Sequence, residues 1–88
     1  MVDKYVVGQI VLSKSGRDKG RPFIIIGVDD DFVYIADGML RKIESPKRKK
    51  MKHVQPTNQI AEKILLGEPL TNVNLKDAIK IYLNKTSK

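Results

Sequence analysis

The sequence predicts a small, mainly β domain followed by a shorter helical part. Runs of branched and aromatic residues separated by turn-forming residues occupy the chain up to Pro56, as in a series of short strands. After Pro56 apolar residues recur at helical spacing instead. The chain has 88 residues and no cysteine, which allows one compact core and no disulfide. Short strands joined by tight turns are typical of a small barrel or sandwich.

Five strands are expected in the first part of the chain. They are 8–13 (GQIVLS), 23–28 (FIIIGV), 32–36 (FVYIA), 39–43 (MLRKI) and 50–54 (KMKHV). The aspartate triplet at 29–31 predicts a turn, because aspartate disfavours strands. Asp37-Gly38 predicts a hairpin turn, because a type I′ turn needs positive φ at both central residues. The polar segment 44–50 is expected to be a loop.

Two helices are expected after the strands. The first covers 57–67, with Thr57 or Asn58 as N-cap and Gly67 as stop. The second covers 70–85 and has three candidate caps and one apolar stripe. The caps are Thr71, Asn72 and Asn74, and the stripe is Leu75, Ala78, Ile79, Tyr82 and Leu83. We expect residues 1–56 to form the β unit and residues 57–88 a helical tail packed on it, not an independent domain.

Positive charge is the most informative feature of the composition. Seventeen Lys and Arg against ten Asp and Glu give a net charge of +7. Residues 1–53 hold twelve of these cations and seven of the acids, a net of +5. The excess is clumped in two segments, 12–23 and 41–52. Clumped positive charge favours a polyanionic partner, and nucleic acid is the most common one.

The first basic segment reads LSKSGRDKGRPF and joins two expected strands. Gly16 and Gly20 bound its loop, and each glycine lets the backbone approach another molecule closely. Asp18 is expected to bond the backbone amides of this loop and fix its shape. Arginine binds a phosphate through two parallel hydrogen bonds, whereas lysine acts as a point charge. A surface hairpin that happens to be cationic is the alternative interpretation.

The second basic segment, 41–52, holds seven cations and one acid. The alternative interpretation here is a solvated loop whose lysines protect a sheet edge from pairing. Taken together, the two segments provide eleven candidate RNA-binding residues, which we expect on one side of the molecule. These are Lys14, Arg17, Lys19, Arg21, Arg41, Lys42, Lys47, Arg48, Lys49, Lys50 and Lys52.

The stretch VGQIVLSKSGRDKGRPFIIIGVDDDFVYIADG (7–38) resembles the KOW motif of ribosomal and transcription-elongation proteins. Gly8 matches the glycine before the motif's first strand. Asp18-Lys19-Gly20 matches its loop, with Gly20 at the hallmark glycine. The following stretch, 39–58, is similar to the small KOW-domain RNA-binding proteins of Gram-positive bacteria. Those proteins are related to the fourteen-e family of large-subunit ribosomal proteins.

The resemblance implies an SH3-like five-stranded barrel that binds RNA without catalysis, often on the ribosome. We therefore expect a basic, monomeric, cytoplasmic protein of translation that contacts phosphates of structured or ribosomal RNA, and ribosomal proteins as further partners. No cofactor or metal is expected. The absence of cysteine suits a reducing cytosol, and the N-terminal residues show no signal peptide. Phosphate contacts by themselves do not distinguish RNA from DNA.

Two other classes of function compete with RNA binding. An SH3-like barrel can instead be a protein-interaction module, which usually needs exposed aromatic side chains. This chain has no Trp and only two Phe and three Tyr. An enzyme is disfavoured because His53 is the only histidine and no serine has an evident base beside it in sequence. We expect no catalytic residue.

Overall fold

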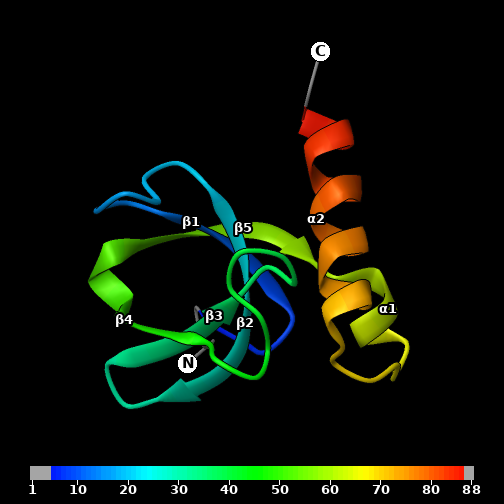
Figure 1. Cartoon of the computed structure of the whole chain (residues 1–88), viewed down its shortest axis with the longest axis horizontal. Coiled ribbons are helices and arrows are strands. Elements are labelled where there is room, and N and C mark those ends of the chain that lie inside the picture. Colours follow the sequence, from blue (N-terminus) through cyan, green and yellow to red (C-terminus); the bar gives the residue numbers. More distant parts are fainter. Residues whose placement is uncertain (1–4, 87–88) are drawn as a thin grey trace.

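The computed structural model describes residues 5–86 and shows a mainly β domain with two helices (Figure 1). The five strands are β1 (Gln9–Ser13), β2 (Pro22–Asp29), β3 (Phe32–Ala36), β4 (Lys47–Lys50) and β5 (Val54–Ile60). A short 3₁₀ helix, η1 (Met51–His53), joins β4 to β5. The helices α1 (Glu62–Leu65) and α2 (Asn72–Thr86) follow. The expected mainly β class with two C-terminal helices is confirmed.

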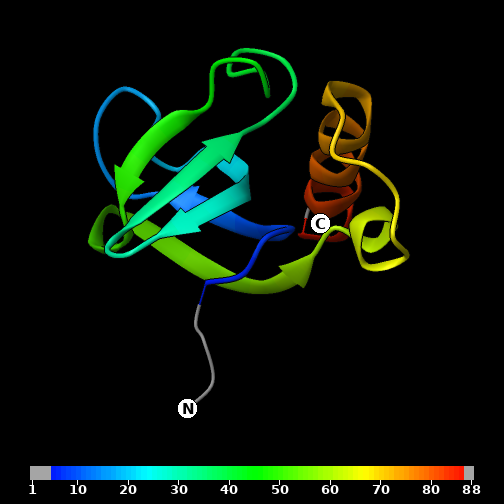
Figure 2. The same ribbon diagram turned by 90° about the horizontal axis from the view of Figure 1, so that it is seen from below.

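All five strands pair antiparallel in one unclosed sheet of order β4-β3-β2-β1-β5. Strands β1, β2 and β3 lie where the sequence predicts them, and Asp30 and Asp31 form the turn between β2 and β3. The sheet is strongly curled (Figure 2). Lys49 on β4 contacts Ser13 on β1, although two strands separate these elements in the sheet order.

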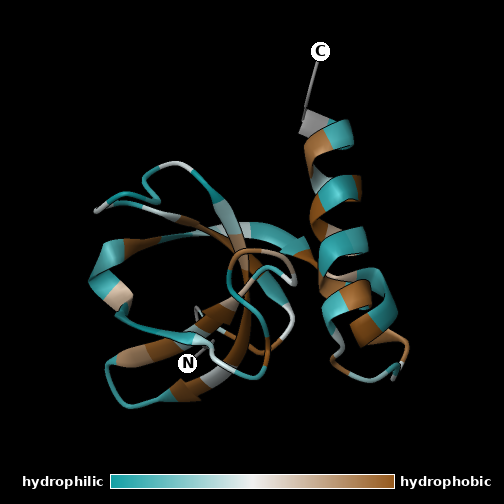
Figure 3. Ribbon diagram, in the orientation of Figure 1, coloured by the Kyte–Doolittle hydropathy of each residue, from teal (hydrophilic) through white to brown (hydrophobic). Residues whose placement is uncertain are grey.

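Both faces of the sheet are covered, so neighbouring residues of one strand are buried on opposite sides. Ile24 and Ile25 in β2 are both 0% exposed. Alternate residues of a strand point to opposite faces, and each isoleucine therefore belongs to a different cluster. Ile25 belongs to the cluster inside the curl, and Ile24 to the cluster beneath the helices. Figure 3 shows hydrophobic residues along the strands of the sheet and on both helices.

Helix α2 packs against the outer face of the sheet and begins at a side-chain cap. Of the three candidate caps, Thr71 has this role, because its hydroxyl accepts a hydrogen bond from the Asn74 amide at 3.0 Å. Leu75 is fully buried against the sheet, whereas Leu83, at the other end of the expected stripe, is 47% exposed. Within residues 5–86, no helix has the length and apolar character needed to cross a membrane.

The prediction of a hairpin at Asp37-Gly38 and a strand at 39–43 is wrong. Residues 37–46 form a loop without strand structure. The Asp37 carboxylate accepts hydrogen bonds from the amides of Met39 and Arg41 at 2.9 and 2.8 Å, and these amides are therefore not available to a ladder. The Ile43 amide donates to the Asn72 side chain of α2 at 2.8 Å. The loop is held by these side-chain bonds and by turn bonds from the amides of Asp37 and Gly38 to the Arg41 carbonyl, without strand pairing.

The expected loop at 44–50 is correct for 44–46 but wrong for Lys47–Lys50, which form β4. These residues pair with β3 in the register Ile35↔Lys47 to Phe32↔Lys50. The expected strand at 50–54 is interrupted: Lys50 ends β4, Met51–His53 form the 3₁₀ helix η1, and Val54 begins β5. The residue types of Lys47–Lys50 did not predict a strand, because lysine is depleted in strands. The segment is a strand because its backbone pairs with β3.

The predicted helix at 57–67 is too long, because β5 continues to Ile60 and α1 covers only Glu62–Leu65. Thr57 does not cap a helix. Its hydroxyl donates to the Ile10 carbonyl at 2.6 Å, and its own carbonyl accepts a bond from the Gln9 side chain at 2.9 Å. Pro56 lies in this strand, opposite Val11, and β5 is at the sheet edge, where proline is tolerated.

Candidate nucleic-acid interface

The loop between β1 and β2, residues 14–21, is closed by its own backbone. The Gly20 amide donates to the Ser13 carbonyl at 2.8 Å, and the Arg21 amide donates to the Asp18 carbonyl at 2.8 Å. Gly16 and Gly20 face open space, with no atom within 4 Å of the position that a Cβ would occupy. The four cations of this loop are all exposed. They are Lys14, Arg17, Lys19 and Arg21.

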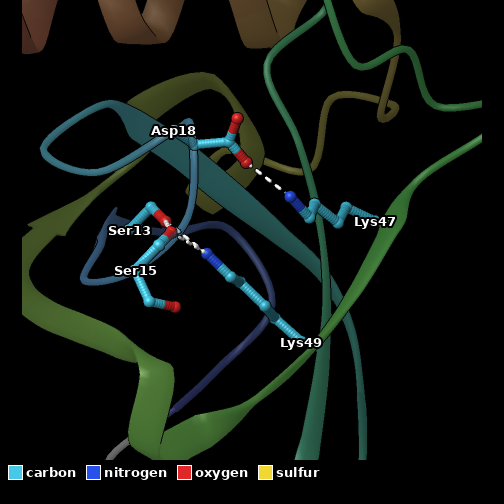
Figure 4. Close-up of polar contacts among 5 residues, drawn as sticks. All are labelled: Ser13, Ser15, Asp18, Lys47 and Lys49. Atoms are coloured by element: carbon cyan, nitrogen blue, oxygen red, sulfur yellow. Dashed lines mark hydrogen bonds and ion pairs between the residues drawn. The ribbon is translucent and has the colours of Figure 1, made fainter.

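Asp18 joins this loop to β4. Its carboxylate accepts a hydrogen bond from Lys47 Nζ at 2.7 Å, and the two side chains form an ion pair (Figure 4). This bond to Lys47 lowers the pKa of Asp18, and the positive charges of Lys47, Lys49 and Arg41 lower it further, while burial opposes them. Within residues 5–86, no amide of the loop bonds this carboxylate. The expectation that Asp18 fixes its own loop through amides is therefore wrong.

Lys49 forms the second link between β4 and the loop. Its ammonium group donates to the hydroxyl of Ser13 and, at 2.9 Å, to the carbonyl of Ser15 (Figure 4). Only 9% of this residue is exposed. Burial lowers the pKa of Lys49, and the neighbouring charge of Lys47 lowers it further, while Asp18 opposes this. The structure thus uses Lys49 to hold the loop and turns its charge inward.

The strand alternation divides the cations of β4 between two faces. Lys47 and Lys49 point toward the loop, so Arg48 and Lys50 point to the other face. The Arg48 guanidinium lies over the Phe32 ring, 3.6 Å from its centroid, which is a cation–π contact. Lys50 and Lys52 are exposed beside the same ring. The basic segment 41–52 therefore does not form one continuous row of charges.

The three remaining predicted residues, Arg41, Lys42 and Gly8, lie outside the loop 14–21 and outside β4. Arg41 is half-buried, and its charge acts on Asp18, whereas Lys42 is exposed. Gly8 is buried beneath α1, where an added Cβ would lie 3.0 Å from the Cγ2 atom of Ile64. This glycine therefore sets the packing of helix on sheet and lies apart from the basic loop.

Sequence reasoning missed Lys76. It lines the same hollow as Arg21, between the start of β2 and α2. Pro22 and Met39 form part of the apolar lining of this hollow. Helix α2 thus places a further cation beside the basic loop. No signal in the sequence identifies Lys76 as a neighbour of Arg21, because lysine is common on amphipathic helices and these two residues are far apart in the chain.

Two basic segments that are distant in sequence therefore meet around one carboxylate. Seven exposed or half-buried cations belong to the loop, to residues 37–46 and to β4. They are Lys14, Arg17, Lys19, Arg21, Arg41, Lys42 and Lys47. Within residues 5–86, no group of three His, Asp or Glu side chains is placed to hold a metal ion. Comparison of the chain with models of protein families gave no match, and comparison with curated proteins gave none either.

Proposed function

We propose that this protein is a non-catalytic RNA-binding protein and that its basic loops contact the phosphates of structured or ribosomal RNA. We also propose that the curled sheet is an SH3-like barrel of the KOW type. The contact between Lys49 on β4 and Ser13 on β1 supports this barrel, because it joins the end strand β4 to a strand that lies three places away in the sheet order. The resemblance of residues 7–38 to the KOW motif supports both proposals.

One observation carries the proposal of RNA binding. The Lys47–Asp18 ion pair joins the loop to β4 at 2.7 Å and leaves Arg17 and Lys19 exposed beside it. Asp18 is the one acid in residues 12–23, and it is already paired with Lys47, so it offsets little of the loop's charge. A rigid cationic surface of this kind attracts a phosphate chain and binds it with little loss of conformational freedom.

The salt dependence of binding to a ribosomal RNA fragment tests this mechanism. If five phosphates are neutralised, the logarithm of affinity falls with the logarithm of salt concentration at a slope of about −3.5 to −4.5. Reversing two charges with R17E and K19E should reduce this slope to about −2 to −2.7, because two contacts are lost. A slope near zero for the unchanged protein excludes phosphate binding.

A matched control separates the local surface from the overall charge. The double variant K80E and K85E changes the net charge by the same amount on exposed residues of α2. We expect this control to retain most of the affinity. Equal losses in both double variants would mean that net charge alone drives binding.

Competition with duplex DNA distinguishes binding of RNA from binding of DNA. Co-sedimentation with ribosomal particles tests association with the ribosome.

A further inference from the structure

A second surface with different chemistry lies between α1 and α2. It is a shallow hollow whose apolar lining includes Leu66, Ala78 and Ile81. Leu66 is 74% exposed and Ile81 is 46% exposed, and both side chains are therefore available to a partner. Leu65 on α1 and Val73 on α2 are each 66% exposed as well. Exposed apolar side chains that line one hollow, as Leu66 and Ile81 do, are typical of a protein–protein contact site.

The rim of this hollow is acidic, although the chain as a whole is basic. The only three acidic residues of segment 54–88 all line it, and these are Glu62, Glu68 and Asp77. Lys63 lines it too and forms an ion pair with Asp77 at 3.6 Å. Three acids and one cation give the rim a charge of −2 on a chain of charge +7.

We propose that this hollow binds a basic amphipathic helical segment of another protein. The apolar face of such a segment would cover Leu66 and Ile81, as helices do in hydrophobic grooves. Its lysines and arginines would face the carboxylates of Glu62 and Glu68, which complements the charge of the rim.

The same charges disfavour the two other occupants. RNA phosphates are repelled by the carboxylates of the rim. A second copy of the chain would form a symmetric contact, in which each patch meets itself and the three acids of one copy face those of the other. Charge complementarity therefore selects a cationic partner.

The hollow and the basic loop lie at opposite ends of the molecule. Figures 1 and 2 both place α1 at the end remote from the loop that joins β1 to β2. A peptide and an RNA can therefore bind at the same time. This inference does not depend on the proposed RNA binding, because it rests on a different surface.

Two synthetic 18-residue helical peptides test the proposal. Both carry leucine along one face, and the other face carries lysine in one peptide and glutamate in its counterpart. Each is titrated into ¹⁵N-labelled protein while backbone amide chemical shifts are recorded. We expect the lysine peptide to shift the amides around Leu66, Ala78 and Ile81 at peptide concentrations of about 10–100 μM. The glutamate peptide should leave them unchanged.

Variants on the exposed surface identify the contact. L66S should weaken binding of the lysine peptide at least tenfold, as expected for a central apolar contact. V28S is the matched control, because Val28 is an exposed apolar residue on β2, outside the hollow. The proposal is overturned if neither peptide shifts these amides, if both do so equally, or if L66S and V28S bind alike. It is also overturned if sedimentation shows that the protein dimerises through Leu66.

Discussion

Gly38, the one glycine of the loop between β3 and β4, should tolerate alanine less well than Gly20, for a reason that appears only in three dimensions. Its φ is +80°, and an added Cβ would lie 2.2 Å from the carbonyl oxygen of Asn72 in α2. Gly20 provides a matched comparison, since its φ is +86° and no atom lies within 4 Å of the same position. Both alanine variants share the conformational strain, and only G38A adds a clash.

The structure gives the size of the difference. Positive φ costs alanine about 1–2 kcal/mol at either site. A carbon–oxygen contact needs about 3.3 Å, so G38A must push the loop about 1 Å away from α2. That movement breaks the bond from the Ile43 amide to the Asn72 side chain, worth about 1 kcal/mol, and disturbs packing by about 1–2 kcal/mol more. We expect G38A to lose about 3–5 kcal/mol and G20A about 1–2 kcal/mol.

Thermal and urea unfolding followed by circular dichroism measure this difference. A gap of about 2–3 kcal/mol corresponds to a midpoint about 10–20 °C lower for G38A than for G20A in a domain of this size. The urea midpoint should fall by about 2 M more. Equal shifts for the two variants would refute the reasoning, because they would show that backbone strain alone matters at Gly38.

Three further predictions concern single side chains. K49M should lower the free energy of unfolding by about 1–2 kcal/mol, because two hydrogen bonds to the loop are lost. K50M, at an exposed site, should change this free energy by less than about 0.5 kcal/mol. Urea unfolding measures both variants, and equal effects would contradict the role given to Lys49. An NMR titration should find the pKa of Asp18 below its ordinary value, and K47M should raise it again. Because the pKa of Asp18 is lower in the folded state, the stabilisation by its ion pair with Lys47 is complete above the unfolded-state pKa near 4. It is lost as the pH falls through the folded-state pKa. A K47M variant with the same acid unfolding as the original protein would contradict this. T71A should cost about 1 kcal/mol by removing the cap of α2, and unchanged thermal stability would show that this cap contributes nothing.

Local sequence signals correctly predicted the segments whose residue preferences match the conformation that they adopt in the structure. Strands β1 to β3 are runs of branched apolar residues, and their buried side chains alternate between two covered faces. Helix α2 has a capping threonine and an apolar stripe that reaches full burial at Leu75. In these segments local preference and burial favour the same conformation, so the prediction did not need the rest of the chain.

Local signals failed where a distant partner decided the conformation. The segment 39–43 looks more strand-like than 47–50, yet the lysine-rich segment is the strand. Its backbone pairs with β3, while Asp37 and Asn72 hold residues 39–43 in a loop. The same applies to β5, which pairs with β1 beyond Pro56. Strand pairing is non-local, and its hydrogen bonds override the weak preferences of short segments.

The sequence by itself determined that this chain is strongly basic and that its excess positive charge lies mainly in two segments. Only the tertiary structure decided what each charge does. Strand alternation and curling turn Lys47 and Lys49 toward the loop at 14–21 and leave Arg48 and Lys50 on the other face. Folding also gathers the acids of segment 54–88 around one apolar hollow. The residue type at each position determines whether a charge is present. The direction in which that charged side chain points, and its neighbours, depend on contacts between segments far apart in the sequence.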